Sequence, residues 1–453
     1  MADRAVIDSA RKWSARQKPR GVVSRRRAAW WGLLLPLVEI SCATPRAVHV
    51  STVSTAAPVS STARDPVQTP PAPPAASESE PVVRVGAKFH YPSAILQDER
   101  AYWVELPDEY ESAVNAQKSY PVLYLLDAER FFAAASATVK FMSQLGTIPE
   151  TIIVGIPSTA QRARDMTPTH SLKGPNGELT QRRATSGGAD AFLSSLQKEL
   201  LPRIEAKYRT MPYRVLAGQS LSGLFALHAF IQDPASFHAI IAMDPSLWWD
   251  DRLLARRAAT SASLTKNLRN SVYIGTANHD AEQDAGRGPK AATQAFSQAL
   301  KSLPAPSLRS KLQAFEDENH GSVPFPSFYY GLSFTFDGYR VPTSGAVKDP
   351  ATIIAHYRQF SEQRGATFEP PEIAFATVAF LLLFEQKKVD QAVAVLEENA
   401  KRHPASPQAH EYLGQAYLAK EDKASAIRCF ERVLQLKPGD EATAQQLQSV
   451  RGK

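Results

Sequence analysis

The sequence predicts a mainly parallel α/β sheet covered by helices on both faces, followed by a small all-helical region. Between about residues 83 and 342, short apolar runs alternate with amphipathic helical stretches, as expected when strands are buried on both sides. From about residue 349 onward the strand-like runs vanish, and apolar residues recur with a period of 34. The chain of 453 residues is long enough to bury a large core.

Seven short runs have the length and apolar content of buried strands. They are 102–107, 121–127, 151–157, 213–218, 238–244, 271–277 and 311–317. Helical stretches such as 191–208 lie between them. Ligands of such sheets bind beyond the C-terminal ends of the strands, so we expect the chemistry just after each run.

The helical region repeats with the period of tetratricopeptide (TPR) units, each of which is a helical hairpin. Matching pairs 34 residues apart include Ala392 and Ala426, Leu396 and Phe430, and Pro404 and Pro438. Residues 407–440 fit this pattern better than residues 373–406. Because there are only about two repeats, we expect them to depend on the preceding α/β domain or on a partner for stability. These helices could serve either as a structural cap or as a groove that binds a protein partner, and the sequence leaves both roles open.

The positive charge of the chain is confined to its start. The formal net charge is +7, and residues 1–27 alone hold nine Lys or Arg against two Asp or Glu. The remaining residues carry 43 charges of each sign. A neutral body gives no electrostatic reason to expect nucleic acid as a partner.

The first 42 residues have the pattern of an export signal. Arg25, Arg26 and Arg27 precede a short apolar run at 28–38, and Ser24-Arg25-Arg26 resembles a twin-arginine signal. Cys42 follows as in a lipoprotein, so lipid anchoring and simple cleavage are both open. We therefore expect an exported protein, periplasmic or in the cell envelope, that meets a membrane only through Cys42. Cys429 is the only other cysteine, so no disulfide within the chain is expected.

These patterns divide the chain into four parts. Residues 43–82 contain eight prolines and no aromatic residue, which is typical of a disordered tether. The predicted parts are an export signal (1–42), this linker (43–82), an α/β domain (83–345) and the TPR-like helices (346–453).

The segment 214–230, RVLAGQSLSGLFALHAF, places Ser220 between a strand-like run and a helix-like run. The pattern is that of a nucleophile elbow, G-x-S-x-G, with Ser222 in place of the last glycine. A serine exposed at such a turn can act as a nucleophile. The backbone N–H of Leu221 would then face the oxyanion.

A base and an acid follow in the chain order expected for a triad of this architecture, namely serine, acid and histidine. His320 comes after the last strand-like run, and we predict it as the base. Asp280 follows the run at 271–277 and is predicted as the acid, with Glu282 as the alternative and Asp284 third. His279 is a weaker candidate for the base, because it follows the strand that should supply the acid.

Several segments together resemble the Putative esterase family of α/β-hydrolases, which includes enterobactin-type siderophore esterases, esterase D-like enzymes and mycolyltransferases. They are YPVLYLLDAERFF (120–132), VGIPSTAQRARDMTPTH (154–170), LLPRIEAKYRTMPYRVLAGQSLSGL (200–224), MDPSLWWDD (243–251) and ENHGSVPFPSFYYGLSFTFDGY (318–339). The resemblance covers about 250 residues in matching order and lies closest to the siderophore-esterase branch. It implies the α/β-hydrolase fold, with a doubly wound and mainly parallel sheet.

The resemblance also implies further site residues. The second oxyanion donor of such enzymes comes from the loop after the early strand, here the Ala128 N–H. Trp248 and Trp249 are candidates to line the substrate pocket, with packing in the core as the alternative. Arg164 is a candidate to meet an anionic substrate, with pairing to Asp165 as the alternative.

The sequence thus predicts a serine carboxylic-ester hydrolase that acts on a small-molecule ester through an acyl-enzyme. No metal-ligand cluster or phosphate-cradling glycine loop is apparent in the sequence, so no cofactor and no metal are implied. Two alternatives stay open: an acyltransferase of the same fold, and a non-catalytic scaffold that binds protein through its helical tail.

Overall fold

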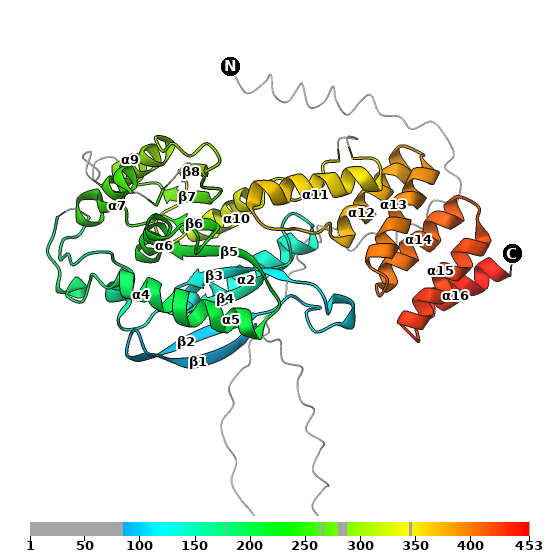
Figure 1. Cartoon of the computed structure of the whole chain (residues 1–453), viewed down its shortest axis with the longest axis horizontal. Coiled ribbons are helices and arrows are strands. Elements are labelled where there is room, and N and C mark those ends of the chain that lie inside the picture. The colour runs from blue at the N-terminus through cyan, green and yellow to red at the C-terminus, as the bar shows by residue number, and fades with distance from the viewer. Residues whose placement is uncertain are drawn as a thin grey trace, which may run out of the picture. The chain divides into compact units, whose positions relative to one another are not determined.

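The computed structural model describes residues 85–175, 177–261, 263–264, 267–279, 288–343 and 347–452. The predicted export signal, its Cys42 and the predicted linker lie outside this part. Glu80–Lys453 forms one compact unit. Figure 1 shows the order of its helices and strands.

An eight-stranded sheet forms the centre of the catalytic part. Its strands are β1 (Ala87–Ser93), β2 (Asp98–Glu105), β3 (Tyr120–Leu126), β4 (Ile152–Ile156), β5 (Thr210–Gln219), β6 (Ala239–Met243), β7 (Ser271–Ala277) and β8 (Arg309–Phe315). Their order across the sheet is β1-β2-β4-β3-β5-β6-β7-β8. The pairs β1–β2 and β2–β4 are antiparallel, and every later pair is parallel. The sheet is therefore mainly parallel, as predicted.

All seven predicted strand runs correspond to strands of the sheet, and β1 was not predicted. β1 lies at the edge of the sheet and is exposed along much of its length. A half-exposed edge strand lacks the continuous apolar run by which buried strands are recognised.

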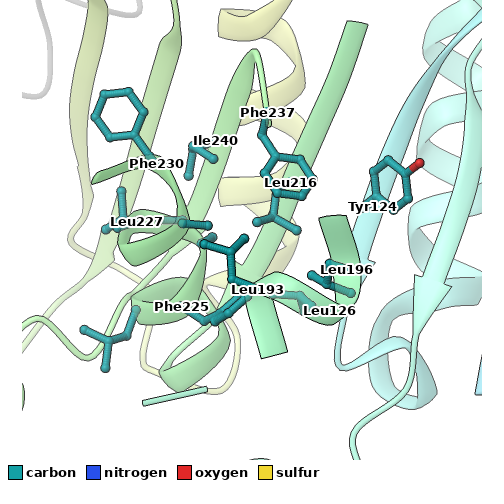
Figure 2. Close-up of a cluster of buried hydrophobic side chains, with 14 of the residues drawn as sticks. Tyr124, Leu126, Leu193, Leu196, Leu216, Phe225, Leu227, Phe230, Phe237 and Ile240 are labelled. Carbon is teal, nitrogen blue, oxygen red and sulfur yellow. The ribbon is translucent and has the colours of Figure 1, made fainter. Parts of the chain in front are cut away.

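Successive residues of each strand point to opposite faces of the sheet and enter two separate cores. In β3, Tyr124 and Leu126 pack on one face, whereas Leu123 and Leu125 pack on the other. Figure 2 shows part of the first core, which contains Leu216 of β5 together with Phe225 and Leu227 of the helix after β5. Burial on both faces explains the near-continuous apolar character of the central strands.

Different helices cover the two faces. The first face is covered by α4 (Ala189–Ser195), a π-helical turn (Leu196–Leu200), α5 (Leu201–Lys207), α6 (Leu221–Gln232), α7 (Trp249–Thr260) and α9 (Pro289–Lys301). The predicted helix at 191–208 corresponds to α4, this turn and α5. The second face is covered by α2 (Ala128–Gln144) and α10 (Pro324–Thr335). A short helix, α3 (Arg162–Asp165), follows β4.

The C-terminal region is entirely helical where it is described. It contains α11 (Pro350–Arg364), α12 (Glu372–Phe380), a π-helical turn (Leu381–Glu385), α13 (Val389–Arg402), α14 (Pro407–Ala419), α15 (Lys423–Leu436) and α16 (Glu441–Arg451). The hairpins α12–α13 and α14–α15 correspond to the two predicted repeats. Apolar residues of α11 to α15 join the core on the second face of the sheet. Within the described ranges, no helix has both the length and the apolar character needed to cross a membrane.

Candidate active site

The turns after β5, β6, β7 and β8 meet at the C-terminal edge of the sheet. The amide of Ser220 donates to the carbonyl of Met243 at 3.0 Å, and the amide of Asp244 donates to the carbonyl of Gly275 at 2.8 Å. The amide of Asn278 donates to the carbonyl of Glu318 at 2.9 Å. These backbone bonds fix each turn to the next, so side chains from four strand ends share one small region.

Ser220 occupies a strained turn between β5 and α6. Its φ and ψ are 60° and −118°, a conformation that residues other than glycine rarely adopt and that costs on the order of 1–3 kcal/mol. A Cβ built on Gly218 would lie 2.5 Å from the carbonyl oxygen of Ser222, so only glycine permits this close crossing of strand and helix. The local geometry is that of a nucleophile elbow, as the sequence predicts.

The hydroxyl of Ser220 lies beside a second hydroxyl from the turn after β6. Its Oγ is 3.3 Å from Oγ of Ser246, and the Ser246 amide donates to the Ser220 carbonyl at 3.0 Å. Ser246 is buried. Among the described residues, Ser220 Oγ has this contact and no hydrogen bond to His320.

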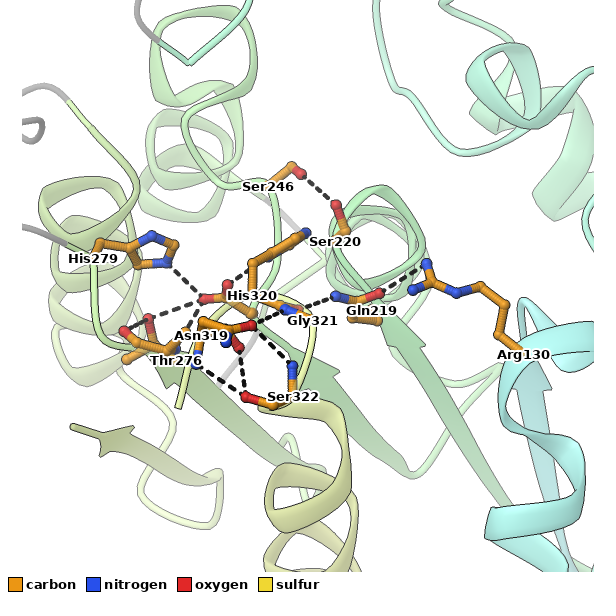
Figure 3. A network of polar contacts seen from close by, with 12 residues as sticks. Arg130, Gln219, Ser220, Ser246, Thr276, His279, Asn319, His320, Gly321 and Ser322 are labelled. Carbon is orange, nitrogen blue, oxygen red and sulfur yellow. Dashed lines mark hydrogen bonds and ion pairs between the residues drawn. The ribbon is translucent and has the colours of Figure 1, made fainter. Parts of the chain in front are cut away.

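His320 lies between Ser220 and a buried carboxylate. Its Nδ1 is 2.6 Å from Oδ2 of Asp244, and in Figure 3 the imidazole extends toward Ser220. An Nδ1 this close to an ionised carboxylate carries the proton, which leaves Nε2 free to accept one. The side chain of His320 is 52% exposed, so an incoming molecule can reach it.

Asp244 follows β6 in a left-handed conformation, with φ of 46°, and its carboxylate is saturated with donors. Oδ1 accepts from Thr276 Oγ1 at 3.2 Å, from the Ala277 amide at 3.1 Å and from His279 Nε2 at 2.9 Å. Burial alone would raise the pKa of Asp244. Hydrogen bonds from His279 and His320 outweigh burial and hold that pKa well below its usual value. Asp244 is therefore an ionised, rigidly held partner for His320.

Asp244 is not among the acids that the sequence predicts. The predicted acids Asp280, Glu282 and Asp284 lie outside the described residues, so the structure places none of them. A signal for Asp244 was present, because it follows the apolar run of β6 directly. The chain order of a triad predicts the acid after the next strand instead, where the structure has His279, which also contacts Asp244.

Two further side chains hold the loop that carries His320. Asn319 Oδ1 accepts from the amides of Gly321 at 2.8 Å and Ser322 at 3.2 Å, which closes a tight turn around the histidine. Gln219 Nε2 donates to the His320 carbonyl at 2.7 Å, and its Oε1 accepts from Arg130 at 3.4 Å (Figure 3). Gln219, the residue immediately before Ser220, thus also holds the loop that carries His320.

The two predicted oxyanion donors are the first residues of two helices. Leu221 begins α6 and Ala128 begins α2. Because the first amides of a helix have no partner within it, both N–H groups are available to an anion. The turns that carry them follow β5 and β3, which are neighbours in the sheet.

The predicted substrate-binding residues have structural partners. Trp249 is fully buried and donates through Nε1 to Thr169 at 3.1 Å, so it belongs to the core and does not line an open pocket. Trp248 is half-buried under the guanidinium of Arg183, which lies 5.1 Å from its ring centroid. Arg164 pairs with Asp165 at 2.7 Å and with Asp98 at 3.1 Å. Its charge is thus neutralised within the fold, in line with the alternative weighed for it.

The sheet order and the strained serine at a strand-to-helix turn define an α/β-hydrolase. The family model described as Putative esterase matches residues 93–310, and one described as Tetratricopeptide repeat matches residues 377–441. The ferri-bacillibactin esterase BesA of Bacillus subtilis is 31% identical over 216 residues, covering 45% of this chain and 74% of that protein. The chain therefore belongs to the Putative esterase family, and it is a carboxylic-ester hydrolase with TPR helices at its C-terminus.

Two other similar proteins extend this comparison. The siderophore enterobactin esterase of Emericella nidulans is 29% identical over 260 residues, covering 49% of this chain and 84% of that protein. The crystal structure of an IroE-like serine hydrolase from Shewanella oneidensis superposes with a TM-score of 0.60 at 29% identity. That superposition covers 70% of this chain and 99% of the other.

Proposed function

We propose that this chain is a serine esterase whose nucleophile, base and acid are Ser220, His320 and Asp244, and that its substrates are siderophore-like esters. The observation that carries the proposal is the 2.6 Å contact between His320 and the buried Asp244, beside a serine in a strained elbow. The names of the two curated relatives, a ferri-bacillibactin esterase and an enterobactin esterase, support the substrate class.

The proposed reaction begins with a rotation of the Ser220 side chain from Ser246 toward His320. Nε2 of His320 takes the hydroxyl proton as Oγ attacks the ester carbonyl, and Asp244 stabilises the imidazolium. The amides of Leu221 and Ala128 donate to the tetrahedral oxyanion. His320 then returns the proton to the leaving alcohol.

The second half of the proposed reaction uses water. Nε2 of His320 takes a proton from a water molecule, which attacks the acyl-enzyme, and the acid product leaves as Ser220 regains its proton. The exposed side chain of His320 leaves room for this water.

Substitution of the nucleophile tests the proposal. With p-nitrophenyl esters, we expect Ser220→Ala to lose at least about 10⁴-fold in kcat. We also expect a fluorophosphonate probe to label the wild type and not the variant. Ser246→Ala is the matched control, because it removes the neighbouring hydroxyl and should keep most of the activity. Equal activity of Ser220→Ala and the wild type would contradict the proposed nucleophile.

The substrate class needs a separate measurement. We expect purified enzyme to cleave a cyclic catecholate tri-ester more efficiently than a simple alkyl ester of similar size, judged by kcat/KM. A preference for the simple ester would refute the siderophore assignment and leave the esterase assignment intact.

We further propose that the protein is exported to the cell envelope. The support is the basic and apolar pattern of the first 42 residues. Fractionation of cells that express the full chain would test this proposal, with Arg25 and Arg26 both replaced by Lys as the comparison. Recovery of the unaltered chain only in the cytoplasm would contradict it.

A further inference from the structure

Ser222 stands where the nucleophile-elbow pattern has its last glycine, and its hydroxyl is used. The residue is fully buried. Its Oγ donates to Oδ2 of Asp127 at 2.5 Å. Any small side chain at position 222 would let β5 and α6 cross closely. The hydrogen bond from Ser222 to Asp127 therefore needs an explanation other than small size.

Asp127 is the partner of Ser222 and directly precedes α2. It adopts a left-handed conformation, with φ of 53°, and its side chain makes no capping bond to its own helix. An aspartate in this position usually accepts from the first amides of the helix that follows. Here the carboxylate turns away and accepts from Ser158, Arg162 and Ser222.

This arrangement leaves the first amides of α2 without a partner among the described residues. The amide of Arg130 donates to the Asp127 carbonyl at 3.0 Å, whereas those of Ala128 and Glu129 have no such bond. The α2 terminus therefore keeps two free donors beside the turn that carries Ser220. Such free donors are what an oxyanion needs.

Arg162 balances the negative charge of Asp127, which lies next to the amides that would bind an oxyanion. Its Nε and Nη2 donate to the two carboxylate oxygens of Asp127 at 2.8 and 2.7 Å. Burial would raise the pKa of Asp127, but the hydrogen bonds and charge of Arg162, together with hydrogen bonds from Ser158 and Ser222, outweigh burial and lower it. The paired cation offsets the repulsion that an isolated carboxylate would exert on an oxyanion.

Arg162 also joins the turn after β5 to the same cluster. Its Nη2 lies 3.3 Å from Ser222 Oγ and 3.4 Å from the carbonyl of Gln219. The turns after β3, β4 and β5 are thereby linked through one ion pair, in which Asp127 is fully buried and Arg162 partly exposed. Two of these turns carry the two sets of oxyanion donors.

We propose that Ser222, Asp127 and Arg162 form a positioning network that fixes the amides at the start of α2 relative to those at the start of α6. Ser222 is the positioning residue on the side of the nucleophile. The proposal rests on the function proposed above, because it assumes that these amides stabilise an oxyanion. It assigns Ser222 a role in the transition state and not only in packing.

Two substitutions of Ser222 test the network. Ser222→Ala removes the donor and keeps the Cβ, and Ser222→Gly restores the residue of the general pattern. We expect each to lower kcat for p-nitrophenyl esters about tenfold, less than the loss of an oxyanion donor itself, with KM within twofold of the wild type. The inhibition constant of an arylboronic acid, which forms a tetrahedral adduct with a serine, should rise by the same factor as kcat/KM falls.

Ser195→Ala is the matched control. Ser195 is equally buried and donates to a backbone carbonyl within α4 at 2.9 Å, with no contact to the network. It should keep the wild-type kcat and the wild-type boronate affinity, measured well below the melting temperature.

Two results would overturn the network. One is a wild-type kcat in both Ser222 variants. The other is a loss of activity that appears in KM while the boronate affinity is unchanged. Failure of the proposed function itself would be recognised separately, as esterase activity that does not depend on Ser220 in the otherwise unaltered protein.

Discussion

The catalytic edge of the sheet and the junction between α10 and the C-terminal helices are held together by different forces. At the edge, directional hydrogen bonds dominate, and Asp244 alone accepts from four groups. At the junction, aromatic rings pack against one another. The ring centroid of Tyr339 lies 5.4 Å from that of Tyr357 and 5.5 Å from that of Phe360.

A polar link at the junction differs in its chemistry from the contacts at the edge. Arg364 of α11 is 2% exposed and donates to the carbonyls of Thr335 and Asp337 at the end of α10. Burial first, and then repulsion from Arg309, lower the pKa of Arg364 to about 10. Its charge meets the carbonyl end of a helix, where cations are favoured. The edge of the sheet holds polar side chains in place, whereas the junction packs apolar side chains. Substitutions at the edge should therefore mainly change activity, and substitutions at the junction should mainly change the free energy of unfolding.

The largest expected effect is the loss of the charge that faces His320. Asp244→Asn keeps the shape of the side chain but favours the wrong tautomer of the imidazole, so kcat should fall on the order of 10⁴-fold. Asp280→Asn provides the comparison, because the sequence argument favoured Asp280. We expect it to retain kcat close to the wild type with p-nitrophenyl esters. An active Asp244→Asn variant beside an inactive Asp280→Asn variant would restore the original assignment.

Removal of a ring at the junction should have the next largest effect, on stability and not on catalysis. Phe360→Ala removes a side chain that is 3% exposed, and we expect it to lower the free energy of unfolding by about 3–5 kcal/mol. Urea unfolding measures this loss, and kcat at 25 °C should stay within twofold of the wild type. Phe141→Ala, at a ring that is 58% exposed, is the control and should cost far less. An equal cost for both would show that the aromatic junction is not part of the cooperative core.

Strands, and the residues that directly follow them, could be predicted from the sequence. Contacts between turns of separate strands could be predicted less well. The positions of Ser220 and His320 after their strands could be predicted because each follows an apolar run that can be recognised by itself. Asp244 reaches His320 only because a left-handed turn directs its carboxylate across the end of β7 toward the loop after β8. No pattern in consecutive residues encodes that direction.

Ser222 and Trp249 also have features that the local sequence pattern does not predict. The elbow pattern predicts a small residue at 222, but the hydrogen bond to Asp127 depends on a turn after a different strand. Trp249 belongs to a pair that could line a pocket or fill a core, and only its complete burial decides for the core. The prediction therefore holds for elements and their order, and it weakens where a contact depends on how turns from separate strands meet.

The smallest expected effect contrasts Asp244 with Glu372, a partly buried carboxylate of the C-terminal helices. Glu372 begins α12 and accepts from Ser406 at 3.0 Å, yet burial raises its pKa. Because the folded-state pKa lies above the unfolded value of about 4.3, ionisation of Glu372 lowers stability as the pH rises past that value. Glu372→Gln should therefore raise the melting temperature at pH 7, and this gain should shrink toward pH 4.

Asp244→Asn should show the opposite sign in the same measurement. The folded-state pKa of Asp244 lies below the unfolded value of about 3.9, so its ionised form stabilises the fold above that pH and loses this effect as the pH falls through the folded-state pKa. The variant should melt below the wild type at pH 7, with a deficit that narrows in acid. If both variants shifted in the same direction at pH 7, the two carboxylates would share one kind of environment. The contrast between a carboxylate held ionised at the edge of the sheet and one whose ionisation is disfavoured among the C-terminal helices would then fail.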